Sequence, residues 1–279
     1  MTPPPDPELL RRLPFPTRPF HRETTGSFPT RLAYDNNLRI PHLLALAGIA
    51  TYTRSFTPAT DDTRGWSAQT PDRIAALSGR SLPELAAAIP ALAMTAATSS
   101  RPLRACSRCT AAKNITGIVI IRARPHDYLC IRHRLWHRGI QDIDLTILPE
   151  VVDRQRRRNR HVNGTSHDAI ARAHQQAQDI IGRWFTTGRH PPLTRRWQDR
   201  HRRLDAGHPG QHLGPIDVIT HPEMLTVAYL LLTAPHAPAI RPGQITASLG
   251  FPYPDRPHPS DPLLRCLSEA ADPKTGQHH

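Results

Sequence analysis

The chain has 279 residues, and its 36 lysines and arginines outweigh 23 aspartates and glutamates to give a formal net charge of +13. This length allows one or two compact domains, while 38% hydrophobic residues and 30 prolines predict a modest core interrupted by loops. The positive charge favours a polyanionic partner, with nucleic acid first. Nearly all of this charge is arginine, since Lys113 and Lys274 are the only lysines, and a GC-rich genome is a second source of arginine that involves no binding role.

Four cysteines in a chain of this length do not form the dense framework of a small secreted domain, and they favour a reducing cytosol. The first residues lack the basic and apolar segments of a signal peptide. The longest apolar run, Leu225 to Ala234, is too short to cross a bilayer and is predicted to be a core helix. We therefore expect a cytoplasmic protein without a membrane partner.

The sequence divides into five predicted regions. Residues 1–12 are predicted to be a disordered tail and residues 13–100 a helical region with two helix-turn-helix-like units, at 31–47 and 73–89. Residues 101–140 are predicted to form a zinc ribbon, 141–250 an arginine-rich helical region, and 251–279 a proline-rich mobile tail. The fold class is therefore mainly α with a small β zinc ribbon.

The two helical units align without gaps at an offset of 42 residues. Apolar, small and proline positions coincide, and Asn37 aligns with Gly79. Asn and Gly both tolerate the left-handed backbone of a tight turn between helices. The aligned pairs are Arg31 with Arg73, Leu32 with Ile74, Ala33 with Ala75, Asn37 with Gly79, Ile40 with Leu82, Pro41 with Pro83 and Leu43 with Leu85.

A unit that reads DNA places the polar side chains of its second helix against base edges. The first unit offers Arg39 and His42 there, and the second offers Arg80, Ser81 and Glu84 before it becomes alanine-rich. Two interpretations stay open: the units read DNA, or they are helical hairpins that pack on one another.

Three of the four cysteines fall in two close pairs, C-x2-C at Cys106 and Cys109 and C-x2-H at Cys130 and His133. Between the pairs lies a β-branched run, Ile118 to Ile121, preceded by a glycine and followed by Pro125. This is the layout of a zinc ribbon, in which two knuckles share one Zn²⁺ in tetrahedral geometry.

The 20 residues between Cys109 and Cys130 suit paired knuckles. Four protein ligands leave no position for water or substrate, so the sequence predicts one structural Zn²⁺. His126 and His137 lie nearby, but only His133 closes a C-x2-H knuckle. Cys266 is expected to be an idle thiol.

Beyond the ribbon, helices are predicted over Leu148 to His161, after the cap Ser166, and at "THPEMLTVAYLLL" with Pro222 in its first turn. The helix after Ser166 is expected to be amphipathic, with the apolar positions Ile170, Ala173, Ala177, Ile180, Ile181 and Trp184. Two arginine clusters are expected on helices, where they either neutralise phosphates or form solvated faces. The first comprises Arg154, Arg156, Arg157, Arg158 and Arg160, and the second, around Trp197, comprises Arg195, Arg196, Arg200, Arg202 and Arg203. The residues predicted to contact nucleic acid are Arg39, Arg80, Arg154, Arg156, Arg157, Arg158, Arg195 and Arg196.

The order of these features resembles the TniQ family of bacterial transposon-associated proteins over about residues 13–140. The family pattern has a Glu-Thr pair, a Leu-Ala helix ending near Asn, a Leu-Leu helix and then a zinc knuckle pair. The matching positions are Glu23, Thr24, Arg31, Leu32, Ala33, Asn37, Leu38, Leu43, Leu44, Cys106, Cys109, Cys130 and His133. Ser107 stands where many members have proline, and Phe28-Pro29 is expected to shift the start of the first helix.

The resemblance implies a helix-turn-helix and zinc-ribbon adaptor that helps transposition proteins choose a target, by binding double-stranded DNA or by docking on a targeting complex. The chain has no phosphate loop, nucleophile elbow or open metal motif, and the carboxylate pairs Asp61-Asp62 and Asp142 with Asp144 read as solvated turns. We therefore expect no enzyme. A protein-docking adaptor or a transcriptional regulator without a role in transposition is the alternative.

Overall fold

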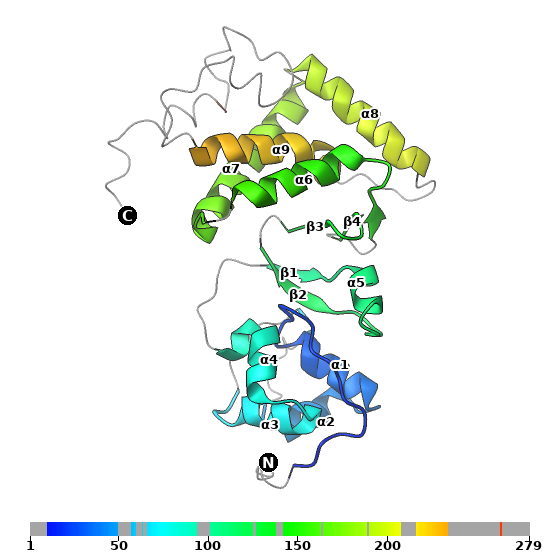
Figure 1. Cartoon of the computed structure of the whole chain (residues 1–279), viewed down its shortest axis with the longest axis vertical. Coiled ribbons are helices and arrows are strands. Elements are labelled where there is room, and N and C mark those ends of the chain that lie inside the picture. The colour runs from blue at the N-terminus through cyan, green and yellow to red at the C-terminus, as the bar shows by residue number, and fades with distance from the viewer. Residues whose placement is uncertain are drawn as a thin grey trace, which may run out of the picture. The chain divides into compact units, whose positions relative to one another are not determined.

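The computed structural model describes residues 10–49, 57–59, 63, 66–93, 101–124, 127–137, 142–162, 164–188, 190–207, 216–233 and 263. The expectations for residues 1–9, for the tail from 251 apart from residue 263, and for Asp61-Asp62 and Cys266 lie outside these residues. The described chain is mainly helical with small antiparallel sheets, as predicted (Figure 1). It divides into two compact units: unit 1 comprises 1–133 and 137–142, and unit 2 comprises 134–136 and 143–279.

Unit 1 begins with two helix pairs, each joined by a short turn (Figure 1). The first pair is α1 (Ser27–Asp35) with α2 (Ile40–Leu46), and the second is α3 (Thr70–Ser78) with α4 (Leu82–Ala88). The residues predicted to be left-handed are so, with φ of 53° at Asn37 and 65° at Gly79.

The backbone hydrogen bonds of the two turns repeat at the same offset as the sequence. The amide of Leu38 donates to the Ala33 carbonyl at 2.9 Å, and the amide of Arg80 donates to the Ala75 carbonyl at 3.1 Å. Such bonds satisfy carbonyls at a helix C-terminus that would otherwise lack a partner. The internal repeat is therefore a repeat of capping geometry as well as of residue type.

One apolar core unites the four helices. The aligned Leu43 and Leu85 are 1% and 0% exposed, and Trp66 and Leu10 pack against the same cluster. Leu10 belongs to the predicted tail, so the ordered part of unit 1 begins before residue 13. Helix α1 also begins four residues before Arg31, because Pro29 lies in its first turn, where a missing N–H costs no helical bond.

The ribbon of unit 1 pairs β1 (Arg101–Arg104) with β2 (Ile120–Ala123) in antiparallel register, with Leu103 opposite Ile121. The strand predicted between the knuckles lies two residues later than the run Ile118 to Ile121. Its partner strand, β1, precedes the first knuckle. A short helix, α5 (Ser107–Ala111), lies between β1 and β2, and a further strand, β3 (Leu129–Cys130), follows β2.

A buried ion pair ties α1 to this sheet. Glu23 is fully buried, and its carboxylate accepts hydrogen bonds from Nε and Nη2 of Arg31 at 2.9 and 2.8 Å and from the Ser27 hydroxyl at 2.8 Å. The neighbouring Thr24 amide donates to the Ile120 carbonyl at 2.9 Å, and Glu23 bridges Ile121. The Glu-Thr and Arg positions of the resemblance therefore have a structural role here, because they join the first helix pair to the ribbon.

In the described part of unit 2, β4 (Leu135–Trp136) pairs with β5 (Ile143–Asp144), and four helices are assigned: α6 (Pro149–His161), α7 (His167–Thr187), α8 (Pro191–Gly207) and α9 (Ile216–Thr233). Helix α9 packs against the other three (Figure 1). The predicted N-cap of α7 is confirmed, because the Ser166 hydroxyl accepts a hydrogen bond from the Ala169 amide at 3.2 Å. The apolar face predicted for α7, Ile170, Ala173, Ala177, Ile180, Ile181 and Trp184, is buried.

The predicted start of the last helix is wrong. Helix α9 begins at Ile216, so Pro222 lies inside the helix and not in its first turn. Nearly all of its side chains from Val218 to Leu231 are buried, including His221 and Glu223. Burial on all sides stabilises the helix through packing, and this offsets the backbone hydrogen bond that proline cannot donate.

Two histidines are buried where α9 packs on its neighbours: His221 belongs to α9, and His174 lies on α7. Nε2 of His221 lies 2.7 Å from Oε1 of Gln155, and Nδ1 of His174 lies 3.2 Å from the Met224 sulfur. Burial, and then the positive charge of Arg158, lowers the pKa of His174 to about 2 and that of His221 to about 3. Both side chains therefore stay neutral in the folded protein.

Unit 2 should lose stability as the pH falls below about 6.5, because the unfolded chain then binds protons that the folded histidines do not. Between pH 7 and pH 5 each histidine should cost about 2 kcal/mol of unfolding free energy. Urea titrations followed by tryptophan fluorescence measure this, since Trp136, Trp184 and Trp197 all lie in unit 2. The variant His221→Gln keeps a donor for Gln155 and should flatten the pH dependence; an unchanged slope would contradict the assignment.

Candidate metal centre and arginine clusters

The first knuckle is the turn that begins α5. Cys106 precedes the helix, and its carbonyl accepts from the amides of Cys109 and Thr110 at 3.0 and 3.1 Å. The Ser107 amide donates to Oδ2 of Asp142 at 3.0 Å, which satisfies a donor at the helix start. This turn directs the sulfurs of Cys106 and Cys109 to the same side.

The second knuckle follows β3, with Cys130 at the strand end and His133 in the next turn. Arg134 closes the turn in a left-handed conformation, with φ of 54°. The Arg108 guanidinium donates to the His133 carbonyl at 3.4 Å, which links the second knuckle to α5.

The four predicted ligands come together. Their ligand atoms, three Sγ and the His133 Nδ1, all lie within 4.8 Å of one another. The Cys109 and Cys130 sulfurs are 3.6 Å apart, and Nδ1 lies 3.2 to 3.5 Å from the three sulfurs. Tetrahedral Zn²⁺ with Zn–S near 2.3 Å and Zn–N near 2.0 Å requires S···S separations of about 3.8 Å and S···N separations of about 3.5 Å. The cluster can therefore hold one metal ion, and its geometry is consistent with zinc.

The thiols of this cluster shift one another's pKa. A hydrogen bond with Cys106 lowers the pKa of Cys130 to about 4, and the same bond raises the pKa of Cys106. The two shifts are opposite sides of one interaction, in which one sulfur donates and the other accepts. A cluster that already favours a thiolate is suited to a divalent cation.

His137 is not part of this cluster. It is buried, its Nδ1 lies 2.9 Å from the Arg104 carbonyl, and the ligand atoms that gather in the cluster do not include it. His126 lies outside the described residues. Within the described chain, His133 is the histidine that the geometry selects.

The first arginine cluster lies on α6 and divides between two faces. Arg156 and Arg157 are exposed and Arg154 is half-buried, whereas Arg158 is only 6% exposed. The prediction that Arg158 contacts nucleic acid is therefore not supported, since its side chain points into unit 2. Position 158 lies seven residues after the buried Val151, about two helical turns, and so shares its face.

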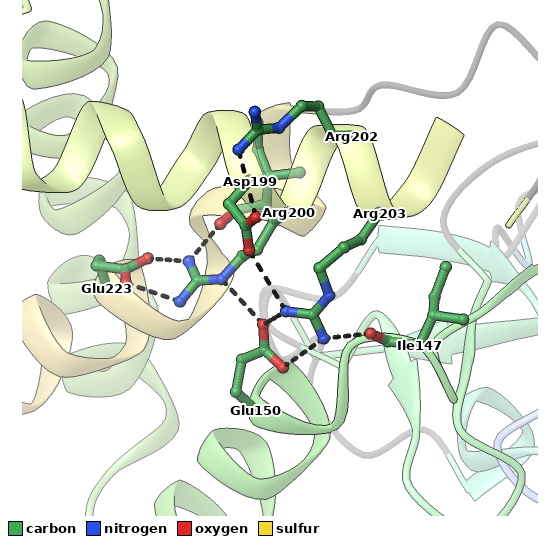
Figure 2. A network of polar contacts seen from close by, with 8 residues as sticks. Ile147, Glu150, Asp199, Arg200, Arg202, Arg203 and Glu223 are labelled. Carbon is green, nitrogen blue, oxygen red and sulfur yellow. Dashed lines mark hydrogen bonds and ion pairs between the residues drawn. The ribbon is translucent and has the colours of Figure 1, made fainter. Parts of the chain in front are cut away.

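Two arginines of the second cluster, on α8, form ion pairs within unit 2 (Figure 2). Arg200 is buried and donates through Nη1 and Nη2 to Glu223 at 2.6 and 3.0 Å, and to the Ile219 carbonyl at 2.6 Å. Arg203 donates to Glu150 at 2.9 Å and to the Ile147 carbonyl. These arginines stabilise the packing of α8, α6 and α9, which the clustering of charge in the sequence did not indicate.

The remaining predicted contacts stand at the surface. Arg195 is exposed and Arg196 half-buried, beside a hollow of about 390 Å³ that Glu150, Asp199 and Arg200 also line. In unit 1, Arg39 is exposed just before α2. Arg80 is half-buried and forms an ion pair with Glu84 at 3.4 Å.

Sequence reasoning missed a groove in unit 1. It has a volume of about 660 Å³ and is lined by side chains from the segment before α1, from α1, from the α3–α4 turn and from the turn after α5. These include Phe15, Arg18, Tyr34 and Lys113. The lining residues come from three stretches that are far apart in sequence, 15–35, residue 80 and 113–116, so a motif search could not find the groove.

The carboxylate pair Asp142 and Asp144 has local roles. Asp142 caps α5, and Oδ1 of Asp144 accepts from the amide and hydroxyl of Thr146 at 2.9 and 2.8 Å. Of the helices in the described ranges, none combines the length and hydropathy needed to cross a bilayer. Comparisons of the chain with protein-family models, with curated proteins and with solved structures found no match.

Proposed function

We propose that this protein is a non-enzymatic, zinc-containing DNA-binding adaptor of the TniQ type, which acts in target-site selection for DNA transposition or in a related DNA transaction. One Zn²⁺, bound by Cys106, Cys109, Cys130 and His133, has a structural role because all four ligand positions come from the protein. The ribbon holds the helix pairs through the Glu23–Arg31 joint.

The observation that carries the proposal is a stripe of exposed arginines along α6. Arg156, Arg157 and Arg160 are exposed, and Arg160 lies four residues after Arg156 and three after Arg157, so it neighbours both of them on one side of the helix. Arg156 also forms a surface ion pair with Asp153 at 3.2 Å, which is worth little and can exchange for a phosphate. A face of this kind suits the backbone of duplex DNA.

The helix pairs of unit 1 support the same proposal. Their capping geometry repeats, and the start of α2 exposes Arg39 and His42. In helix-turn-helix proteins the first residues of the second helix contact base edges. The α6 stripe then provides affinity, and α2 provides selectivity.

Mobility shifts on duplex DNA at two salt concentrations test this function. We expect tight binding that weakens steeply with salt, with the slope falling by about one for each of Arg156→Ala and Arg157→Ala. Arg202→Ala is the matched control, because Arg202 is also an exposed helical arginine paired with an aspartate, Asp199 at 3.4 Å, but it lies on α8 and outside the α6 stripe. Absence of duplex binding at low salt, or equal losses in all three variants, would refute the proposal.

A protein-docking adaptor is the second candidate, and one observation favours it. A hollow of about 460 Å³ on unit 2 is lined by Phe185, Trp197 and Ile219, with His201 and Arg202 among its other lining residues. Aromatic and arginine side chains are enriched where proteins bind one another. If the protein does not bind DNA but does bind transposition proteins, the docking adaptor replaces the DNA-binding adaptor as the proposed function.

A further inference from the structure

We infer that the groove of unit 1, here called the Tyr34 groove, binds a short unpaired stretch of nucleic acid. The groove is lined by Phe15, Arg18, Tyr34, Arg80, Lys113 and Asn114, among others. It is a different surface from the α6 stripe and from α2, so the inference does not rest on duplex binding.

The groove exposes two aromatic rings. The side chain of Tyr34, in the last turn of α1, is 78% exposed, and that of Phe15 is 63% exposed. Both rings line the same hollow. Large aromatic side chains that stay in water gain free energy when a flat ligand covers them, and every nucleobase offers such a face.

The Phe15 platform is held in place before any ligand arrives. The Phe15 amide donates to Oδ1 of Asn36 at 2.9 Å, and Nδ2 of Asn36 donates back to the Phe15 carbonyl at 2.9 Å. The same Nδ2 also donates to the Leu32 carbonyl of α1 at 2.9 Å. A backbone fixed at two points loses little conformational entropy on binding.

Cations surround these rings. Arg18 and Lys113 are exposed in the lining, Arg80 is half-buried, and the Lys113 ammonium stands 4.7 Å from the centroid of the Phe20 ring. The lining also includes the carboxylate of Asp35, which accepts from the Thr17 hydroxyl at 2.6 Å. The positive side chains outnumber this carboxylate, so an anionic ligand is favoured.

Rings and cations together select an unpaired strand. In a duplex the neighbouring base pairs already cover the faces of each base, so an exposed ring finds no partner there. In a single strand the bases stack on aromatic side chains while the phosphates meet arginine and lysine. Asn114 and Thr116 add polar groups at the edge of the groove, which are suited to base edges.

Fluorescence anisotropy of the full chain with labelled oligothymidine and oligouridine of about 12 nucleotides tests the inference. A duplex of the same length and polyglutamate serve as competitors. Tyr34→Ala should weaken single-strand binding at least about fivefold, and Phe15→Ala similarly, whereas duplex binding should change less than about twofold. Arg18→Ala should lower the salt slope by about 0.7, the value for one phosphate contact on a single strand.

Tyr229→Ala is the matched control, because Tyr229 is 41% exposed on α9 in unit 2 and lies outside the groove. Since Phe15 and Tyr34 are exposed, their variants should fold as the parent does. Binding of either oligonucleotide with loss on Tyr34→Ala supports the inference, and the preferred one identifies DNA or RNA as the source.

Three results would overturn the inference. One is single-strand affinity that Tyr34→Ala leaves unchanged. A second is competition by polyglutamate as strong as by oligonucleotide, which would identify an acidic protein segment as the occupant. The third is duplex binding with no single-strand binding, which would leave the proposed function intact. Conversely, if the protein binds single strands but no duplex, the proposed function is refuted and the inference about the Tyr34 groove is supported.

Discussion

Cys106→Ser should abolish stoichiometric zinc binding and unfold the ribbon. Purified protein should contain one equivalent of zinc, and the variant well below one. Structural zinc contributes apparent binding free energies of about 10–16 kcal/mol in small zinc domains, and this free energy is coupled to folding. The local apolar core is small, with Phe20, Ala105, Ile115 and Val119 as its buried members, so it cannot replace that contribution.

Metal analysis and circular dichroism check this result, with chelation of the parent protein as a second route to the same state. Cys266→Ser is the control, because Cys266 is the cysteine of the chain that belongs to neither predicted knuckle. It should retain one equivalent. A parent protein that is folded and free of metal, or a Cys106→Ser protein that keeps a full equivalent, would show that the cluster is not a zinc site.

Glu223→Ala should destabilise unit 2 by about 3–5 kcal/mol. Glu223 is 3% exposed, and its carboxylate accepts hydrogen bonds from both terminal nitrogens of Arg200. It also accepts one from Nε1 of Trp197, at 3.1 Å. Removal of this carboxylate leaves a buried guanidinium whose other carboxylate partner is Glu150, at 3.4 Å. An uncompensated buried charge costs far more than the intact pair contributes.

Denaturant unfolding followed by tryptophan fluorescence measures this loss. Asp153→Ala, which breaks the exposed pair with Arg156, is the matched control and should cost less than about 1 kcal/mol. Glu223→Gln keeps the hydrogen-bonding shape without the charge and should fall between the two. If Glu223→Ala and Asp153→Ala cost the same, the network of Figure 2 does not stabilise the helix packing.

Local features were predictable because neighbouring residues decide them. The left-handed turns at Asn37 and Gly79, the Ser166 cap and the apolar face of α7 depend on residues within a turn or two of each other. The proximity of the four metal ligands was predictable for a related reason: each knuckle is a tight turn, and metal chemistry supplies the link between the two knuckles.

Other features were not predictable because they depend on residues far apart in the chain. Arg200 looked like a surface charge in "RRWQDRHRR", but it lies on the buried face of α8 with Leu193, Trp197 and Leu204. Helical periodicity alone could have placed Arg158 beside Val151 on the inner face of α6. The partner of Arg200, Glu223, lies 23 residues away on another helix, and only the packing of the two reveals it.

The sequence by itself therefore determined the helical class, the turns at Asn37 and Gly79, the Ser166 cap, the internal repeat and the composition of the metal cluster, since each follows from short-range backbone and ligand chemistry. Only the tertiary structure decided which arginines face solvent and which neutralise buried carboxylates. It also decided that Phe15, Tyr34 and Lys113 line one groove. Charge and exposure depend on which surfaces pack together, and packing joins residues that no local pattern relates.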